Sequence, residues 1–197
     1  MGVRALRRAV FLDRDGVLNR AIMRGGRPFP PAGIAELELV PNALQALELL
    51  RERDFLTIVV TNQPDVARGT QTQAAVEAIN AYIAVELPLD AMYVCYHDNE
   101  DACACRKPKP GLVQRASKEH GIDVGSSYLI GDRYKDIDCG SRAGCRTILI
   151  DYGYAEPKGN VMPDFTVTTL IGAVHTIIAE ERKSHEYALR IESQDIR

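Results

Sequence analysis

Short apolar runs alternate with segments of helical periodicity along the chain. The apolar runs predict strands at residues 9–13, 56–61, 92–95, 128–130 and 147–150, and a short edge strand at 165–167. The segments between them predict helices at about residues 42–53, 70–87, 111–120, 133–142 and 170–181. Strands that are apolar at consecutive positions are typical of buried parallel sheets. The pattern therefore predicts an α/β fold, with a Rossmann-like, mostly parallel sheet and helices on both faces.

The length and composition favour one domain. The chain has 197 residues, of which 46% are hydrophobic, and this is enough for one substantial core. We therefore expect a single domain over residues 1–197. The charged C-terminal segment, about residues 170–197, is expected to form a helix or a partly disordered tail.

Charge and cysteine content narrow the class of partner. The formal net charge is −3 and no dense run of lysine and arginine is present, which argues against nucleic acid as a partner. No stretch approaches the ~20 apolar residues of a membrane span, and the N-terminus lacks a signal-peptide core. We therefore expect a cytoplasmic monomer without a membrane partner, whose five cysteines are reduced thiols or metal ligands.

Two carboxylates one residue apart follow the first predicted strand. Asp13 and Asp15 come directly after an apolar run, and Gly16 permits a turn out of the sheet. Ligands of open α/β sheets bind at the carboxyl ends of the strands. Because neighbouring carboxylates repel each other, this pair indicates a divalent cation and an anionic substrate. Asp132, with Asp136 four positions on, follows the fourth strand and would complete a magnesium site.

Polar residues at two other places suit phosphate binding. The second strand ends in three hydrogen-bonding residues, Thr61, Asn62 and Gln63. A hydroxyl followed by backbone N–H groups in a tight turn can hold phosphate oxygens. Lys107 supplies a compact charge that offsets a carboxylate and a phosphoryl group, and Arg106 supplies a planar fork for a second oxyanion. Arg133, next to Asp132, is a further candidate for substrate binding.

A histidine and three cysteines cluster after the third strand. They are Cys95, His97, Cys103 and Cys105. Two close pairs of such donors across a short spacer are typical of a structural, tetrahedral zinc site. The acidic loop between the pairs has few apolar residues, so zinc would order residues 95–105 and place Arg106 and Lys107 over the site. Cys139 and Cys145 are expected to be small buried residues.

Four motifs together resemble those of the haloacid dehalogenase (HAD) superfamily of phosphatases. In chain order they are Asp13-x-Asp15-Gly16, Thr61, Lys107 and Gly131-Asp132-x-x-x-Asp136. The zinc loop running into Cys-Arg-Lys-Pro is similar to the branch that contains D-glycero-D-manno-heptose 1,7-bisphosphate phosphatases and histidinol-phosphate phosphatases. The resemblance covers about residues 9–153, most of the chain.

The resemblance implies a mechanism and two cofactors. Asp13 would be the nucleophile that forms an aspartyl-phosphate, and Asp15 would be the general acid/base. Thr61 and Lys107 would stabilise the phosphoryl group, and Arg106 would contribute to substrate recognition. The implied ligands of a catalytic Mg²⁺ are Asp13, the Asp15 carbonyl and Asp132, whereas Zn²⁺ would be structural.

The substrate is less constrained than the chemistry. No cap domain of ordinary size fits between the motifs, so the zinc loop and residues 20–36 must shape the pocket. The basic residues Arg24 and Arg27 favour a bisphosphorylated sugar. The resemblance implies that this sugar is heptose 1,7-bisphosphate, which would lose its 7-phosphate. Pro64 and Asp65 replace the Ser-Gly pair typical of heptose phosphatases, which removes a backbone donor and adds negative charge. The alternatives are a histidinol-phosphate or other sugar-phosphate phosphatase, a phosphotransferase, and a non-catalytic zinc-stabilised binding module.

Overall fold

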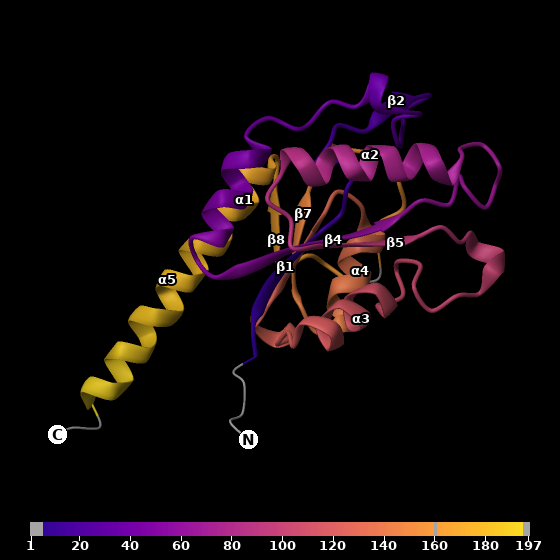
Figure 1. Cartoon of the computed structure of the whole chain (residues 1–197). Helices are drawn as coiled ribbons and strands as arrows, with labels where there is room; N and C mark the ends of the chain where they lie inside the picture. The colour runs from indigo at the N-terminus through magenta and orange to yellow at the C-terminus, as the bar shows by residue number, and fades with distance from the viewer. Residues whose placement is uncertain (1–5, 160, 195–197) are drawn as a thin grey trace.

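Six parallel strands form the central sheet (Figure 1). The computed structural model describes residues 6–159 and 161–194. The strands of this sheet are β1 (Arg8–Leu12), β4 (Phe55–Asn62), β5 (Ala91–Cys95), β6 (Tyr128–Gly131), β7 (Arg146–Ile150) and β8 (Phe165–Val167). They lie in the order β5-β4-β1-β6-β7-β8, and every neighbouring pair is parallel. The predicted parallel α/β fold is confirmed, with strands at all the predicted places.

Helices cover both faces of the sheet (Figure 1). One face carries α1 (Ala43–Arg51), α2 (Gln73–Glu86) and α5 (Leu170–Gln194), and the other carries α3 (Gly111–His120) and α4 (Tyr134–Ala143). Each layer buries its own set of apolar side chains against the strands. Leu47, Ile83 and Ile177 belong to the first core, and Val113 and Cys139 belong to the second.

The two cores explain why the strand sequences are apolar at consecutive positions. In β1, Val10 and Leu12 face the core under α1, α2 and α5, whereas Ala9 and Phe11 face the core under α3 and α4. Successive side chains of a strand point to opposite faces of its sheet. A strand that is covered on both faces must therefore be apolar at every position, and none of these four side chains is exposed.

A small antiparallel hairpin lies outside the main sheet. Its strands are β2 (Ile22–Arg24) and β3 (Arg27–Phe29), joined by Gly25 and Gly26 at φ of 56° and 75°. Glycine adopts positive φ without a Cβ penalty, and two such residues form the turn that matches the twist of a hairpin. The sequence pattern predicts this segment only as a wall of the pocket and does not predict the hairpin, because strands of three residues are too short to show a periodicity.

The C-terminal segment is helical as far as it is described. Helix α5 continues to Gln194, well past the end predicted near residue 181, and residues 195–197 of the predicted tail lie outside the described part of the chain. Short 3-10 turns occur at Ile34–Glu36, Asn99–Asp101 and Val124–Ser126. Within residues 6–159 and 161–194, no helix is both long enough and apolar enough to span a membrane.

Candidate active site

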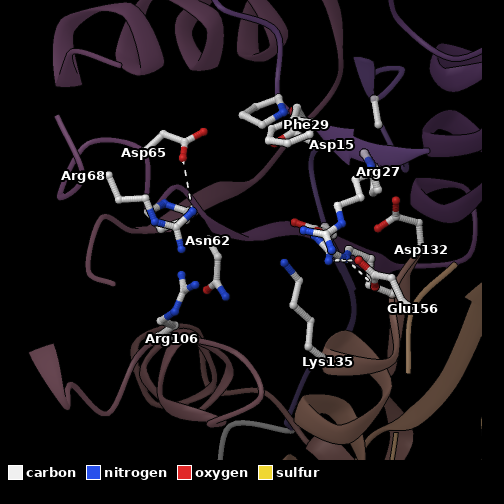
Figure 2. Close-up of a pocket in the computed structure, with 16 residues that line it drawn as sticks. Asp15, Arg27, Phe29, Asn62, Asp65, Arg68, Arg106, Asp132, Lys135 and Glu156 are labelled. Atoms are coloured by element: carbon white, nitrogen blue, oxygen red, sulfur yellow. Dashed lines mark hydrogen bonds and ion pairs between the residues drawn. The ribbon is translucent and has the colours of Figure 1, made fainter. Parts of the chain in front are cut away.

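The carboxyl ends of β1, β4 and β6 meet at a pocket of about 330 Å³ (Figure 2). The predicted site residues that line it are Asp13, Asp15, Asn62, Arg106, Asp132 and Arg133. The predicted residues Thr61, Gln63 and Lys107 are buried beside this pocket and do not line it. The hairpin strand β3 contributes Arg27 and Phe29 to the pocket wall, and the turn after β4 contributes Asp65 and Arg68.

Asp13 and Lys107 form a buried ion pair at the floor of the site. The Oδ1 atom of Asp13 lies 2.9 Å from Lys107 Nζ and accepts a 2.8 Å hydrogen bond from the backbone N–H of Arg14. Burial raises the pKa of Asp13, but Lys107 and the nearby Lys135 outweigh burial and hold that pKa below its ordinary value. Asp13 is therefore an ionised carboxylate that is almost fully buried at the pocket floor.

Lys107 is held from three sides. Its ammonium lies 2.9 Å from Asp13 Oδ1 and 2.7 Å from Asp136 Oδ1, and it donates a 2.8 Å hydrogen bond to the carbonyl of Val60. Burial alone would lower the pKa of Lys107, but the Asp13 and Asp136 carboxylates raise it above its ordinary value. Asp136 is fixed in turn, because its Oδ2 accepts a 3.1 Å hydrogen bond from the Arg133 N–H.

Three carboxylates, those of Asp13, Asp132 and Asp136, lie close enough to hold a metal ion. One oxygen of each falls within 4.8 Å of the others. Burial, together with Asp136 and Asp13, raises the pKa of Asp132 well above its ordinary value, and its buried Oδ1 atom has no hydrogen-bond partner among the described residues. An added cation would relieve both conditions.

Two glycines allow these carboxylates to come this close. A Cβ at Gly16 would lie 2.0 Å from Asp132 Oδ2, and a Cβ at Gly131 would lie 2.1 Å from Asp136 Cβ. Gly16 also has a φ of 85°, a conformation that other residues rarely adopt. The glycines of the first and fourth motifs therefore leave the space that the carboxylate cluster occupies.

Asp15 is oriented by side chains that sequence analysis did not connect with it. The guanidinium of Arg14 donates to both of its oxygens at 3.0 Å. Asn19 donates to Oδ1 at 3.0 Å, and Gln63 donates to Oδ2 at 2.7 Å. Arg14 is fully buried and also donates a 2.8 Å hydrogen bond to Asn80 on α2. Gln63, predicted to bind substrate, is therefore placed as a support for Asp15.

Asn62 ties the end of β4 to the loop that carries Lys107. Its side-chain amide donates to the Lys107 carbonyl and accepts from the Lys107 N–H, both at 3.0 Å. Asn62 lines the pocket while making these contacts. Thr61, at the end of the same strand, accepts a 3.1 Å hydrogen bond from Gln63.

The four predicted thiol and imidazole donors lie together. Sγ of Cys95 is 3.2 Å from Sγ of Cys105, 3.8 Å from Sγ of Cys103 and 3.6 Å from Nδ1 of His97. The four donor atoms all fall within 4.8 Å of one another, so these residues could hold a metal ion. Burial and the neighbouring thiol of Cys105 raise the pKa of Cys95 to about 12. A bound cation would favour the thiolate instead.

The loop between the two donor pairs also fixes Arg106. The Arg106 guanidinium donates to Asn99 Oδ1 at 2.8 Å and to the His97 carbonyl at 3.2 Å, and it lies 3.4 Å from Asp98. Asp98 accepts two further hydrogen bonds, of 2.6 and 2.8 Å, from Arg68. Asp98 thus holds two arginines at the rim of the pocket.

Two other basic residues line the pocket with different environments. Arg133, a predicted substrate-binding residue, is ion-paired with Glu156. Lys135 lines the pocket and was not among the predicted site residues, which in this motif were Asp132, Arg133 and Asp136. Its position between Asp132 and Asp136 in the sequence does not predict which way the Lys135 side chain points, because neighbouring positions of a helix point to different sides. Cys139 and Cys145 are buried in the core beside α3, as predicted.

Comparison with known proteins identifies the family. Residues 104–173 match the HAD-hydrolase-like family. A D-glycero-D-manno-heptose-1,7-bisphosphate 7-phosphatase of Chlorobaculum tepidum is 32% identical over 200 residues, which cover 91% of this chain and 98% of the relative. The corresponding β-heptose enzyme of Bordetella bronchiseptica is 32% identical over 152 residues, 73% of this chain and 80% of the relative.

Structural similarity agrees with these relationships. The crystal structure of the B. bronchiseptica D,D-heptose 1,7-bisphosphate phosphatase, complexed with magnesium and phosphate, has a TM-score of 0.71 and 26% identity and covers 88% of this chain and 99% of its own. The chain therefore belongs to the HAD-like hydrolases. Within that family it is a phosphatase, a phosphoric monoester hydrolase, so the predicted family and enzyme class are both confirmed.

Replacing Arg14 with methionine should destabilise the fold. The change leaves Asp15 without its bidentate partner and Asn80 without a donor, and we expect a loss of roughly 3 kcal/mol in the free energy of unfolding, typical of a broken buried ion pair. Denaturant titration measures this loss. The control, Arg115→Met, removes an exposed pair with Glu119 on α3 and should change stability by less than about 1 kcal/mol. Equal losses would contradict a structural role of Arg14.

Proposed function

We propose that the protein removes the 7-phosphate of D-glycero-D-manno-heptose 1,7-bisphosphate through an aspartyl-phosphate on Asp13. The observation that carries this proposal is the buried Asp13 carboxylate, held by Lys107 and the Arg14 N–H beside two further carboxylates at the sheet edge. The names of the relatives described above support the substrate.

Asp13 has the charge and the free atom that a nucleophile needs. Attack by a carboxylate on a phosphate dianion is opposed by repulsion, so nearby positive charge must offset it. Lys107 supplies such a charge at 2.9 Å, on Oδ1. Among the described residues Oδ2 accepts no hydrogen bond, which leaves it free to attack phosphorus as the bond to the leaving sugar oxygen breaks.

Asp15 is the proposed general acid/base. It would protonate the leaving oxygen of the sugar and later remove a proton from the water that hydrolyses the aspartyl-phosphate. Its carboxylate lines the pocket beside Asp13. Hydrogen bonds from Arg14, Asn19 and Gln63 fix its direction, and fixed geometry is what efficient proton transfer requires.

The site fits a magnesium ion on Asp13 and Asp132. Hard carboxylate oxygens are the ligands that Mg²⁺ prefers, and the Asp15 carbonyl is the proposed third protein ligand. The buried Oδ1 of Asp132, which lacks a hydrogen-bond partner among the described residues, supports this fit. Mg²⁺ would neutralise charge on the phosphoryl oxygens when bound. Asp136, already in contact with Lys107, is proposed to position that lysine.

The Cys95, His97, Cys103 and Cys105 cluster fits a structural zinc ion. Three soft sulfur donors and one imidazole suit Zn²⁺ and leave no open coordination position for chemistry. The segment between the donor pairs, Asp98 to Ala102, contributes no residue to either hydrophobic core. Zinc would therefore order the loop that holds Arg106 at the rim and leads into Lys107.

The basic rim supports a substrate with a second phosphate. Arg106, Arg68 and Arg27 line the pocket, whereas Lys107 is buried beside it. A planar guanidinium whose backbone is fixed suits bidentate phosphate binding. The alternative substrate, histidinol phosphate, carries a cationic amine, which these three arginines would repel.

We also propose that the protein acts as a monomer in the cytoplasm. None of the five cysteines forms a disulfide, and cysteines outside disulfides are typical of that compartment.

Replacing Asp13 with asparagine should abolish turnover without unfolding the protein. An amide of nearly the same volume cannot form the acyl-phosphate. Steady-state hydrolysis of heptose 1,7-bisphosphate and thermal unfolding measure the two effects. The control is Asp151→Asn, which alters an exposed carboxylate at the end of β7 outside the pocket and should leave activity unchanged. Steady hydrolysis by pure Asp13→Asn protein would refute the nucleophile assignment.

Zinc should be present at one ion per chain, and its loss should destabilise the protein. Cys103→Ser removes one ligand, and we expect less bound zinc, a lower melting temperature and lower activity, because the loop is built on the metal. Elemental analysis and thermal unfolding report on this. The control is Cys145→Ser, which alters a buried thiol outside the cluster and should retain zinc whatever its effect on stability. Freshly purified protein without zinc would disprove the site.

Replacing Arg106 with alanine should separate bisphosphate from monophosphate substrates. Losing one partner of a hydrogen-bonded charge pair costs roughly 2–5 kcal/mol, so kcat/KM for the bisphosphate should fall steeply. The matching 7-phosphate monoester lacks the group being held and should lose much less. Rates over both substrates and histidinol phosphate, with Mg²⁺, test the substrate class as well. Equal losses for the two sugars would show that Arg106 does not bind the second phosphate.

A further inference from the structure

Asp65 lines the pocket from a turn whose backbone is fixed. The turn follows β4, and Asp65 comes three residues after Asn62 at the end of that strand. The Asp65 carbonyl accepts hydrogen bonds from the N–H groups of Thr70 and Gln71, at 2.9 and 3.1 Å. Pro64, which also lines the pocket, has no backbone N–H to offer a ligand. At this point of its wall the pocket therefore presents a carboxylate acceptor and no backbone donor from Pro64.

The Asp65 carboxylate is only partly paired. Its Oδ1 atom lies 3.4 Å from Arg68, which gives its shorter contacts, of 2.6 and 2.8 Å, to Asp98. Figure 2 shows one oxygen of Asp65 linked to Arg68 and the other directed away from it. Among the described residues Oδ2 accepts no hydrogen bond, and 21% of the side chain is exposed. An accessible carboxylate oxygen is thus left for a donor on a ligand.

The other acidic side chains of the pocket already have a partner or a proposed role. Three of them are the proposed reacting and metal-binding groups, Asp13, Asp15 and Asp132. Glu156 is ion-paired with Arg133 and accepts a 2.8 Å hydrogen bond from its Nε. Asp65 thus differs from these four residues, because it lies outside the reacting group and its one ion pair is long.

Asp65 lies where two spaces join. A groove of about 600 Å³ adjoins the pocket near the start of α2. Four residues line both spaces, and they are Phe29, Pro30, Asp65 and Arg68. A ligand that extends from the nucleophile towards this groove therefore passes the Asp65 carboxylate. In a sugar that carries a phosphate at each end, the part that passes Asp65 is the hydroxylated chain between the phosphates.

A hydroxyl group suits the free oxygen of Asp65, whereas a phosphate does not. A hydroxyl donates a hydrogen bond, and a hydrogen bond to an ionised acceptor is stronger than one to a neutral acceptor. A phosphate carries negative charge at neutral pH and is repelled by a carboxylate at close range. The charge of Asp65 thus opposes phosphate at this point of the pocket and favours hydroxyl groups.

We propose that Asp65 is a specificity-determining residue that accepts hydrogen bonds from the hydroxyl groups of the sugar. The assignment rests on the proposed phosphatase function and adds to it the recognition of the part of the substrate that lies between the two phosphates. A site built to bind a substrate hydroxyl rejects an analogue that lacks it, because the polar group of the site is then left unpaired.

The assignment is tested with Asp65→Ala, which removes the carboxylate, and Asp65→Asn, which keeps a neutral oxygen acceptor. The control is Glu52→Ala, which alters an exposed carboxylate at the end of α1 outside the pocket. Two substrates are compared in the presence of Mg²⁺: heptose 1,7-bisphosphate, and heptane-1,7-diol bisphosphate, which carries both phosphates and no hydroxyl group. Thermal unfolding checks that each variant is folded.

The quantity measured is kcat/KM for the sugar divided by kcat/KM for the diol. A change of charge beside Arg68 acts on both substrates and cancels in this ratio. The ratio should fall roughly 10–100-fold in Asp65→Ala, the factor expected for losing a hydrogen bond to a charged group. Asp65→Asn should lose less, and Glu52→Ala should match the parent protein. The rate on the diol should not fall in either Asp65 variant, because the diol has no hydroxyl group for Asp65 to bind.

Two results would overturn the assignment. A ratio in Asp65→Ala equal to that of the Glu52→Ala control would show that Asp65 binds no hydroxyl group. An equal rise in kcat/KM for both substrates would show that Asp65 only repels the phosphates.

A second pair of substrates separates this assignment from the proposed substrate. If the parent protein does not hydrolyse the heptose, the same ratio is measured with fructose 1,6-bisphosphate and hexane-1,6-diol bisphosphate. A fall of that ratio in Asp65→Ala would show that the heptose proposal fails and the assignment of Asp65 stands. A parent protein that hydrolyses neither sugar would overturn both.

Discussion

The site depends on one buried cation and its two carboxylates. Lys107 lies between Asp13 and Asp136 and reaches the carbonyl of Val60, so it joins the ends of β1 and β4 to α4. Removing three charges from water is costly unless each one is paired and hydrogen-bonded. The network therefore constrains these elements to one arrangement, and that arrangement fixes the Asp13 carboxylate at the edge of the sheet.

The middle of the segment that leads to Lys107 is not held by the core. Residues 98–102 belong to neither hydrophobic core, and they are held between the donor pairs by polar contacts such as that of Arg106 with Asn99. Asn62, at the end of β4, then holds the backbone of Lys107 by two hydrogen bonds. The sheet edge and the polar loop thus both hold Lys107. The position of the Asp13 carboxylate depends on both contacts, because either one alone would leave the Lys107 side chain free to move.

The sequence was sufficient for the fold and for the ends of the strands, because both are local signals. Consecutive apolar positions mark strands buried on two faces, and polar residues at their ends mark the site. Contacts between residues that are far apart in the chain could not be predicted from these local signals. Asp15 is oriented by Gln63, and Arg14 is satisfied by Asn80, pairs that only the packing of α2 and β4 brings together. The three contacts of Lys107, with Asp13, Asp136 and the Val60 carbonyl, likewise come from residues far apart in the sequence.

The pairing of charges also bears on selectivity. Most basic side chains around the pocket already have carboxylate partners: Asp98 for Arg68 and Arg106, and Glu156 for Arg133. An anionic substrate must share or displace these partners, so overall negative charge alone gains little affinity. Discrimination then depends on where phosphates lie relative to the fixed guanidinium groups. Asp65, 3.4 Å from Arg68, strengthens this effect, since it adds a further carboxylate at the rim.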